Sequence, residues 1–296
     1  MIEIRRILCP CDFSGYSARA LHQARRIAER HGSSLTVLHV IPTAVPASGG
    51  FAALTNPALL YPEVHERTLS ALRRFVERAG PATLPEDVEV REGNPAQEIL
   101  KRATELPADL LAIGTHGRGG FEKWVLGSVT ERVLRKARCP VLTVPARGAL
   151  PTGRALFDTI LWATDFSAPA TAALEHAVSL ARPDRARLLL VHVVAHAAEV
   201  REPGSPPDLA TELQERVREW LRKAVPEEVR SACAVEEIVA VGKPHREIAR
   251  LAREKGVELI VMGAQGADAL DHMIFGSTVQ RVLRMAPCPV LTARAG

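Results

Sequence analysis

Short apolar runs alternate with amphipathic stretches along the first half of the chain. Residues 4–10 form an apolar run suited to a buried strand. Ser14 is placed to cap a helix that Gly32 ends, and the apolar residues of that helix recur every three or four positions, at Ala20, Leu21, Ala24 and Ile27. Buried strands that alternate with helices predict a parallel sheet with helices on both faces.

The same alternation continues to the middle of the chain. We predict further strands at 34–40, 87–91, 109–113 and 139–144. Residues 41–62 are a Pro/Gly/Ala-rich loop, and helices are expected near 62–79, after Asn94-Pro95 and from Gly127-Ser128. The expected strand order is 3-2-1-4-5, that of a doubly wound, Rossmann-like α/β fold. In such a sheet the order reverses between the first and fourth strands, and ligands bind at that reversal.

The second half of the chain repeats the first. The segment ILCPCDFSGYSARALHQA at 7–24 matches ILWATDFSAPATAALEHA at 160–177, and EGNPAQEIL at 92–100 matches VGKPHREIA at 241–249. Matching blocks in the same order indicate a duplicated unit. We therefore expect two tandem domains with five-stranded parallel sheets, at 1–147 and 155–296, joined by a Pro/Gly/Ala-rich linker at 145–155.

Composition and charge narrow the class of protein. Hydrophobic residues make up 47% of the chain, but no apolar run reaches the roughly 18 residues that span a bilayer. The net charge is only +4, and basic residues are interleaved with Glu, as on a solvated helix face. We expect neither a membrane nor nucleic acid as a partner. The N-terminal segment is typical of a strand rather than a signal peptide, which favours the cytoplasm.

The cysteines do not form a recognisable metal motif. Cys9 and Cys11 would share one face of the first strand, but no second Cys pair or His pair accompanies them. The simpler interpretation is that the five cysteines are small buried hydrophobic residues in a reducing compartment.

A candidate anion site falls where the strand order reverses. An acid follows the first strand of each copy, Asp12 and Asp165. A glycine-rich loop follows the fourth strand of each copy, and nine residues separate its second glycine from its last. These loops contain Gly114, Gly117 and Gly127-Ser128 in the first copy, and Gly263, Gly266 and Gly276-Ser277 in the second. Glycines let backbone amides approach an anion, and a helix N-terminus attracts phosphate. Phosphates on the loop, ribose on the acid and base beside the first two strands describe a nucleotide.

Each of these residues also has a simpler interpretation. A glycine at a strand end can serve only the turn, and Asp12 followed by Ser14 can serve only to cap the helix. His39 and His192, at matching positions in apolar strands, are expected to be hydrogen-bonded core histidines. The nucleotide hypothesis gains weight because the loop spacing is the same in both copies while the residues between the glycines differ.

With these motifs the chain resembles the universal stress protein family, once per half, as in its tandem members. The resemblance implies an adenine-nucleotide α-hydrolase-like fold that binds ATP, with Asp12 holding the ribose. It places Pro10, Cys11 and Val40 beside the adenine, and Ile113, Gly114, Gly117, Arg118, Gly127, Ser128 and Val129 around the phosphates. The matching residues of the second half are Asp165, Val193, Met262, Gly263, Gly266, Gly276, Ser277 and Thr278.

The second half departs from the first at the expected phosphates. Arg118-Gly119 becomes Ala267-Asp268, so a cation is lost and an anion gained, and Pro10 becomes Ala163. Two unit charges about 5 Å apart interact by roughly 3 kcal/mol at an effective dielectric constant near 20. We therefore expect the first half to bind ATP more tightly than the second.

No catalytic constellation stands out. The chain lacks a Walker A string, since Gly242-Lys243 is followed by Pro244, and His116 inside the loop is explained equally well by loop polarity. The leading hypothesis is a regulatory nucleotide binder. The alternatives are slow ATP hydrolysis or phosphoryl transfer, with Mg²⁺ held only through the nucleotide, and a nucleotide-free scaffold.

The fifth strands bear on assembly. CPVLTV and CPVLTA would each be an open apolar edge if left unpaired. The family resemblance suggests that these strands pair with each other across a pseudo-twofold within one chain, and that two chains then associate as a homodimer.

Overall fold

The described residues of the computed structural model form one sheet flanked by helices. They are residues 2–43, 57–80, 86–116, 126–145, 148, 150–151, 153–195, 207–266 and 275–295. The strands are β1 (Arg6–Pro10), β2 (Ser34–Pro42), β3 (Glu86–Gly93), β4 (Leu110–Gly114), β5 (Val141–Val144), β6 (Thr159–Ala163), β7 (Arg187–Val194), β8 (Val235–Val241), β9 (Leu259–Gly263) and β10 (Val290–Ala293).

The helices connect these strands in strict alternation over most of the chain. They are α1 (Gly15–His31), α2 (Pro57–Arg78), α3 (Pro95–Glu105), α4 (Ser128–Lys136), α5 (Ala168–Ala181), α6 (Pro207–Ala224), α7 (Glu227–Ala232), α8 (Pro244–Glu254) and α9 (Ser277–Met285), with a short 3₁₀ turn, η1 (Arg182–Asp184). The predicted α/β class with two tandem Rossmann-like units is confirmed.

Helix ends follow the chemistry of the capping residues. The Ser14 side chain accepts a hydrogen bond from the Ser17 amide at the start of α1, and Gly32 ends the helix in the left-handed region, with φ 66°. Asn94 caps α3 in the same way as Ser14 caps α1. The capping signals that the sequence carries at these positions are confirmed.

The predicted start of the second helix near residue 62 is wrong. The helix begins at Pro57 and continues through Pro62. A proline inside a helix removes one backbone donor, but its fixed φ is compatible with helical backbone, so the helix can pass through it near its start. Most of the predicted loop at 41–62, residues 44–56, lies outside the described residues.

The ten strands run in the order β3-β2-β1-β4-β5-β10-β9-β6-β7-β8. Strands within each half are parallel, whereas β5 and β10 pair antiparallel, with Leu142 opposite Leu291. The predicted pairing of the two fifth strands within one chain is confirmed. It joins the two expected five-stranded sheets into one mixed sheet and leaves neither of these apolar strands at an open edge.

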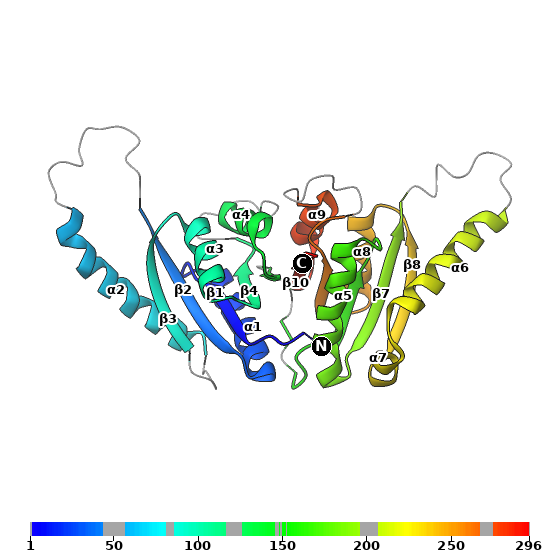
Figure 1. The fold of residues 1–296 in the computed structure, drawn as a ribbon, viewed down its shortest axis with the longest axis horizontal. Coiled ribbons are helices and arrows are strands. Elements are labelled where there is room, and N and C mark those ends of the chain that lie inside the picture. Colours follow the sequence, from blue (N-terminus) through cyan, green and yellow to red (C-terminus); the bar gives the residue numbers. More distant parts are fainter. Residues whose placement is uncertain are drawn as a thin grey trace.

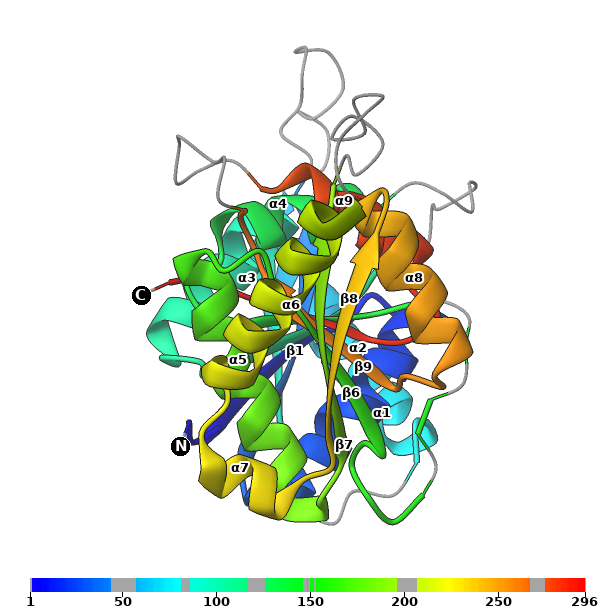
Figure 2. The same cartoon turned by 90° about the vertical axis from the view of Figure 1, so that its right-hand side faces the viewer.

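The two halves lie side by side along the long axis of the molecule, with α2 and α6 at opposite ends and β10 near the centre (Figure 1). Figure 2 shows helices on both sides of the strands of the second half, with α5 on one side and α8 on the other. Two apolar clusters fill these two faces. Alternate residues of β1 divide between them, Ile7 and Cys9 into one cluster and Leu8 into the other.

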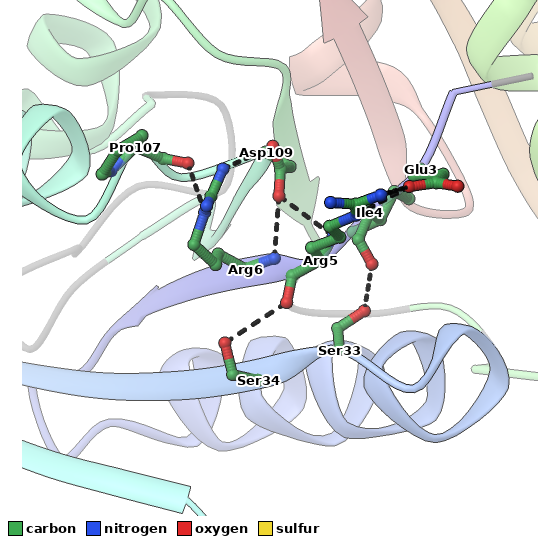
Figure 3. A network of polar contacts seen from close by, with 8 residues as sticks. All are labelled: Glu3, Ile4, Arg5, Arg6, Ser33, Ser34, Pro107 and Asp109. Atoms are coloured by element: carbon green, nitrogen blue, oxygen red, sulfur yellow. Dashed lines mark hydrogen bonds and ion pairs between the residues drawn. The ribbon is translucent and has the colours of Figure 1, made fainter.

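Polar contacts tie the amino ends of the central strands together (Figure 3). Asp109, just before β4, accepts hydrogen bonds from the backbone amides of Arg5 at 3.0 Å and Arg6 at 2.9 Å. The Ser34 hydroxyl donates to the Arg5 carbonyl at 3.2 Å. These contacts fix the start of β1 relative to β2 and β4, and so they also fix where its carboxyl end lies.

Candidate functional site

The candidate site lies at the carboxyl ends of β1 and β4. These strands are neighbours, with Leu8 opposite Leu111, although β2 and β3 lie between them in the chain order. β1 therefore has a crossover to each side, which is the position at which open parallel sheets bind ligands. In the second half β6 lies between β7 and β9 in the same way.

The acid after the first strand takes part in the start of the next helix. The Asp12 carboxylate accepts hydrogen bonds from the Ser14 amide, at 3.1 Å, and from the Ser14 hydroxyl. Its counterpart Asp165 accepts from the Ser167 amide at 3.1 Å. Asp12 is half-buried and Asp165 is exposed. Both carboxylates thus contribute to the start of the next helix, as the capping interpretation expects. The same hydrogen bonds hold them at the carboxyl ends of β1 and β6.

The glycine that ends the fourth strand is required by packing. A Cβ on Gly114 would lie 2.9 Å from the Cβ of Tyr16, and one on Gly263 would lie 2.7 Å from the Ala170 nitrogen. Both glycines therefore admit the first turn of α1 or α5 against the strand end. This contact brings the helix that follows the acid up to the loop that follows the fourth strand.

The last helix of each half begins at a glycine. Gly127 is the N-cap of α4 and Gly276 that of α9, and no side chain of the described residues caps either helix at this end. The glycine amides donate to the Thr115 carbonyl at 2.9 Å and the Ala264 carbonyl at 3.1 Å, which fixes the helix start against the strand end. Ser128 and Ser277, the first helical residues, are exposed.

This helix start has the electrostatics of an anion site. The first amides of an α-helix have no partner within the helix, and the helix dipole adds partial positive charge at the same end. A Ser or Asp at the N-cap would satisfy one of those amides, as Ser14 does in α1. Glycine supplies no such acceptor, and its own φ of −59° at Gly127 is open to any residue. A glycine N-cap thus does not itself occupy these amides, unlike the Ser14 cap of α1.

In the second half the acid and the loop glycines converge. A Cβ built on Gly266 would lie 2.9 Å from Oδ2 of Asp165, and one built on Gly276 would lie 3.6 Å from the Gly266 nitrogen. Asp165 is about a hundred residues away in the chain from the two glycines. In the first half Gly117 and Arg118 lie outside the described residues, as do Ala267 and Asp268 in the second.

The residues expected around the base are mostly part of the core. Pro10, Cys11, Val40, Ile113 and Met262 are buried, and Val193 is half-buried. The Cys11 amide donates to the Leu38 carbonyl at 2.7 Å. Burial raises the pKa of the Cys11 thiol to about 12, so the thiol stays protonated and unreactive at neutral pH. Val129 and Thr278, on the second positions of α4 and α9, are half-buried.

His39 borders the candidate site, a place that its position in an apolar strand did not indicate. Nδ1 of His39 lies 2.7 Å from the Cys11 carbonyl oxygen, and its ring centroid lies 4.5 Å from that of Phe13. The expected hydrogen bond is confirmed, but the residue borders the candidate site and is only half-buried. The available signal was the co-occurrence in both copies of this histidine and the Asp-Phe-Ser triplet at 12–14 and 165–167.

Among the described residues, none of the helices has the length and hydropathy of a membrane span. Within those same residues, no group of three or more His, Cys, Asp or Glu side chains is arranged to hold a metal ion.

Fold and site together define a tandem α/β protein with one candidate site per half at the carboxyl ends of parallel strands. Each candidate site combines a hydrogen-bonded carboxylate with a helix that begins at a glycine. This arrangement suits a ligand that carries both hydroxyls and an anionic group.

Comparison with known proteins gives the family. The model of the universal stress protein family matches residues 3–145 and again 156–294. The chain belongs to the universal stress protein family.

Individual relatives agree with a tandem member of this family. A universal stress protein of Mycobacterium tuberculosis is 25% identical over 276 residues, which cover 88% of this chain and 87% of the relative. One from Methanocaldococcus jannaschii is 33% identical over 144 residues, 47% of this chain and 81% of the relative. The crystal structure of a universal stress protein from Archaeoglobus fulgidus covers 100% of both chains, with a TM-score of 0.70 and 26% identity.

Proposed function

We propose that this chain is a regulatory protein that binds ATP at the carboxyl ends of β1 and β4, and more weakly at β6 and β9. One observation carries the proposal. In the second half, Asp165 meets Gly266 and Gly276, which are about a hundred residues further along the chain, at the reversal of strand order. The first half repeats the acid, the strand-end glycine and the glycine N-cap.

The phosphates are assigned to the start of α4. The backbone amides at Ser128 and Val129 supply donors, and Gly114 and Gly127 border them. The loop residues Gly117 and Arg118 complete this group by the sequence pattern. Each contact between an anion and a helix start contributes about 0.3–1 kcal/mol when exposed and more when partly buried, so several amides must act together.

The ribose is assigned to Asp12. A carboxylate accepts hydrogen bonds from sugar hydroxyls, and Ser14 holds this carboxylate in one orientation. The adenine is assigned to the surface formed by Pro10, Cys11 and Val40, with Ile113 between base and phosphates. Because the Cys11 amide already donates to Leu38, this part of the base site acts by packing.

The second half has residues equivalent to those assigned in the first half, but we expect them to bind the nucleotide more weakly. Asp165, Gly263, Gly266, Gly276, Ser277 and Thr278 correspond to the assigned residues, with Val193 and Met262 beside the base. The Asp165 carboxylate is exposed, and Ala267-Asp268 replaces the cation of the first loop. Like-charge repulsion from Asp268 weakens triphosphate binding unless Mg²⁺ accompanies the nucleotide.

Mass spectrometry of the denatured, freshly purified protein tests the proposal. ATP that co-purifies in a stoichiometric amount supports a nucleotide-binding regulator. ADP that accumulates during incubation with Mg²⁺ supports slow hydrolysis instead. Absence of any nucleotide, together with no uptake of added ATP at millimolar concentration, would favour a nucleotide-free scaffold and overturn the proposal.

Association of two chains into a homodimer is a separate part of the proposal. The fifth strands are already paired inside one chain, so a dimer must use another surface. Size-exclusion chromatography with light scattering gives the mass in solution, with and without ATP. A mass of one chain, 32.1 kDa, under both conditions would contradict this part.

A further inference from the structure

A repeated contact between the first two strands of each half surrounds the acid of the candidate site. His39 lies on β2, and its Nδ1 is 2.7 Å from the carbonyl oxygen of Cys11, the residue before Asp12. His192 lies at the same place on β7, with Nδ1 2.8 Å from the carbonyl oxygen of Thr164, the residue before Asp165. A carbonyl oxygen only accepts, so Nδ1 of each histidine carries the proton that it donates.

The residue after the acid is held as well. Phe13 and Phe166 have left-handed backbone, with φ of 63° and 62°. Side chains other than glycine adopt this conformation at a cost, so the surrounding structure must impose it. The histidine ring supplies one contact, with ring centroids 4.5 Å apart for Phe13 and His39 and 4.9 Å apart for Phe166 and His192.

A third aromatic ring closes each cluster from the outer helix. Phe75 on α2 contacts Phe13 edge-on at 5.7 Å, and Trp220 on α6 contacts Phe166 edge-on at 5.6 Å. The arrangement is therefore the same in both halves, although Pro10-Cys11 in one corresponds to Ala163-Thr164 in the other. Because the contact between histidine and phenylalanine is kept while the neighbouring residues differ, it depends on these two side chains.

We propose that His39 and His192 are positioning residues that fix Asp12 and Asp165 for the ligand. Each histidine holds the peptide group before the acid by a hydrogen bond and the residue after it by ring contact. The backbone on both sides of the acid is then fixed, so its carboxylate is held in one orientation toward the ligand. This inference rests on the proposed nucleotide site, because it assigns to the acid the hydroxyls of a bound nucleotide.

The test compares the binding of ATP and of tripolyphosphate to the first site, in a chain whose second site is blocked. In a Gly276→Val background, which blocks the helix start of α9, calorimetry measures the affinity for ATP and for tripolyphosphate. His39→Leu removes the Nδ1 donor and is expected to lower the affinity for ATP about tenfold, the effect of weakening one hydrogen bond. Tripolyphosphate has no hydroxyls for Asp12, so its affinity should stay within about twofold of the parent's.

Two more variants separate positioning from a structural role. His39→Asn places an amide donor near the position of Nδ1 and should recover most of the ATP affinity. Asp12→Ala combined with His39→Leu should bind ATP no more weakly than Asp12→Ala alone, because the histidine acts through the acid. A thermal melt of each variant reports on folding.

Specific results would overturn this inference. These are unchanged ATP affinity in His39→Leu, equal losses for ATP and tripolyphosphate, or additive losses in the double variant. In each of these cases the parent still binds ATP, so the proposed function stands. If the parent itself binds no ATP, the proposed function fails first, and the positioning role fails with it.

Discussion

The two halves of the chain share one backbone plan but treat the acid of the candidate site differently. In the first half Asp12 is half-buried and accepts from both the amide and the hydroxyl of Ser14. In the second half Asp165 is exposed and accepts from the Ser167 amide. A duplication preserves strand ends and helix starts, because the fold needs them, while the side chains that set affinity are free to diverge.

The halves also differ in how their first helix contacts the rest of the molecule. Arg19 of α1 donates to the carbonyls of Pro145, at 3.0 Å, and Gly148, at 2.7 Å. Arg26, about two turns further along the same face of α1, donates to carbonyls of the linker, and Arg30 contacts Asp184 at 2.7 Å. The positions that correspond to Arg19, Arg26 and Arg30 in the second half are Ala172 and Ser179 in α5 and Pro183 in η1. The arginines of α1 thus add contacts with the linker and with the second half to those made by the pairing of β5 with β10.

The largest expected effect comes from blocking the helix start of one half at a time. Gly127→Val should weaken ATP binding in the first half by more than about a hundredfold, because a branched side chain covers several amides that act together. The backbone at Gly127, with φ −59° and ψ 139°, accepts valine, so the fold should persist. Calorimetry measures the affinity and circular dichroism the fold.

The matched control is Gly276→Val. A Cβ at Gly276 has no neighbour closer than 3.4 Å, so this variant should fold as well. It should remove only the weaker binding event. If Gly127→Val and Gly276→Val reduce binding equally, the assigned difference between the halves is wrong, and if neither does, the phosphate site is misplaced.

The next effect concerns pH and a pair of equivalent positions, the buried Gln23 in α1 and the half-buried His176 in α5. Burial lowers the pKa of His176 to about 4. Between pH 6.5 and 4 the unfolded chain takes up a proton there that the folded chain excludes, so stability falls as pH falls. His176→Gln should reduce this loss by about 3 kcal/mol, the value of the pKa difference.

Chemical denaturation at pH 7 and at pH 4 measures this difference. The comparison uses the change in unfolding free energy between the two pH values, so a constant effect of the substitution cancels. Equal changes for the parent and His176→Gln would mean that His176 is accessible to protons in the folded state.

A smaller effect is expected at the acids. Asp12→Ala should lower the affinity for ATP about tenfold or more, the effect of losing a hydrogen bond to a charged group. The affinity for pyrophosphate should stay unchanged. Asp165→Ala should weaken binding at the second site by less, because its carboxylate is exposed to water. Calorimetric titration with both ligands checks this. Equal losses for ATP and pyrophosphate would reduce Asp12 to a helix-capping residue.

The smallest effect is at Gln23. Its side chain is fully buried, and neither of its polar atoms has a hydrogen-bond partner among the residues that the structure describes. Gln23→Met keeps the shape and removes the unsatisfied amide, which should stabilise the protein by about 1 kcal/mol or more. Urea unfolding measures it. A loss of stability would indicate that the amide has a partner, such as a buried water molecule.

Much of the fold could be predicted from local patterns in the sequence. The caps at Ser14 and Asn94 and the left-handed end at Gly32 follow from residue chemistry that acts within a few positions. The unfavourable apolar edge of the fifth strands indicated that they would be covered, and the family resemblance indicated that they would pair with each other. The start of α2 at Pro57 could not, because helix ends without a capping signal depend on contacts elsewhere.

For the candidate site, the sequence indicated which residues the fold brings together, but not the contacts that hold them. The repeat pointed to Asp165, Gly266 and Gly276, which the fold brings together. The reason for glycine at position 114 is contact with Tyr16, and no sequence pattern shows which element will approach a strand end. His39 was taken for a core residue, because an apolar strand does not reveal which carbonyl a side chain will reach.

Titration of the nucleotide-free protein with ATP in a calorimeter tests the central claim most directly. We expect one tight binding event per chain, in the first half, followed by a weaker one in the second. No detectable binding up to millimolar ATP, or two events of equal affinity that Gly127→Val leaves unchanged, would contradict the assignment of the glycine-started helices as phosphate sites.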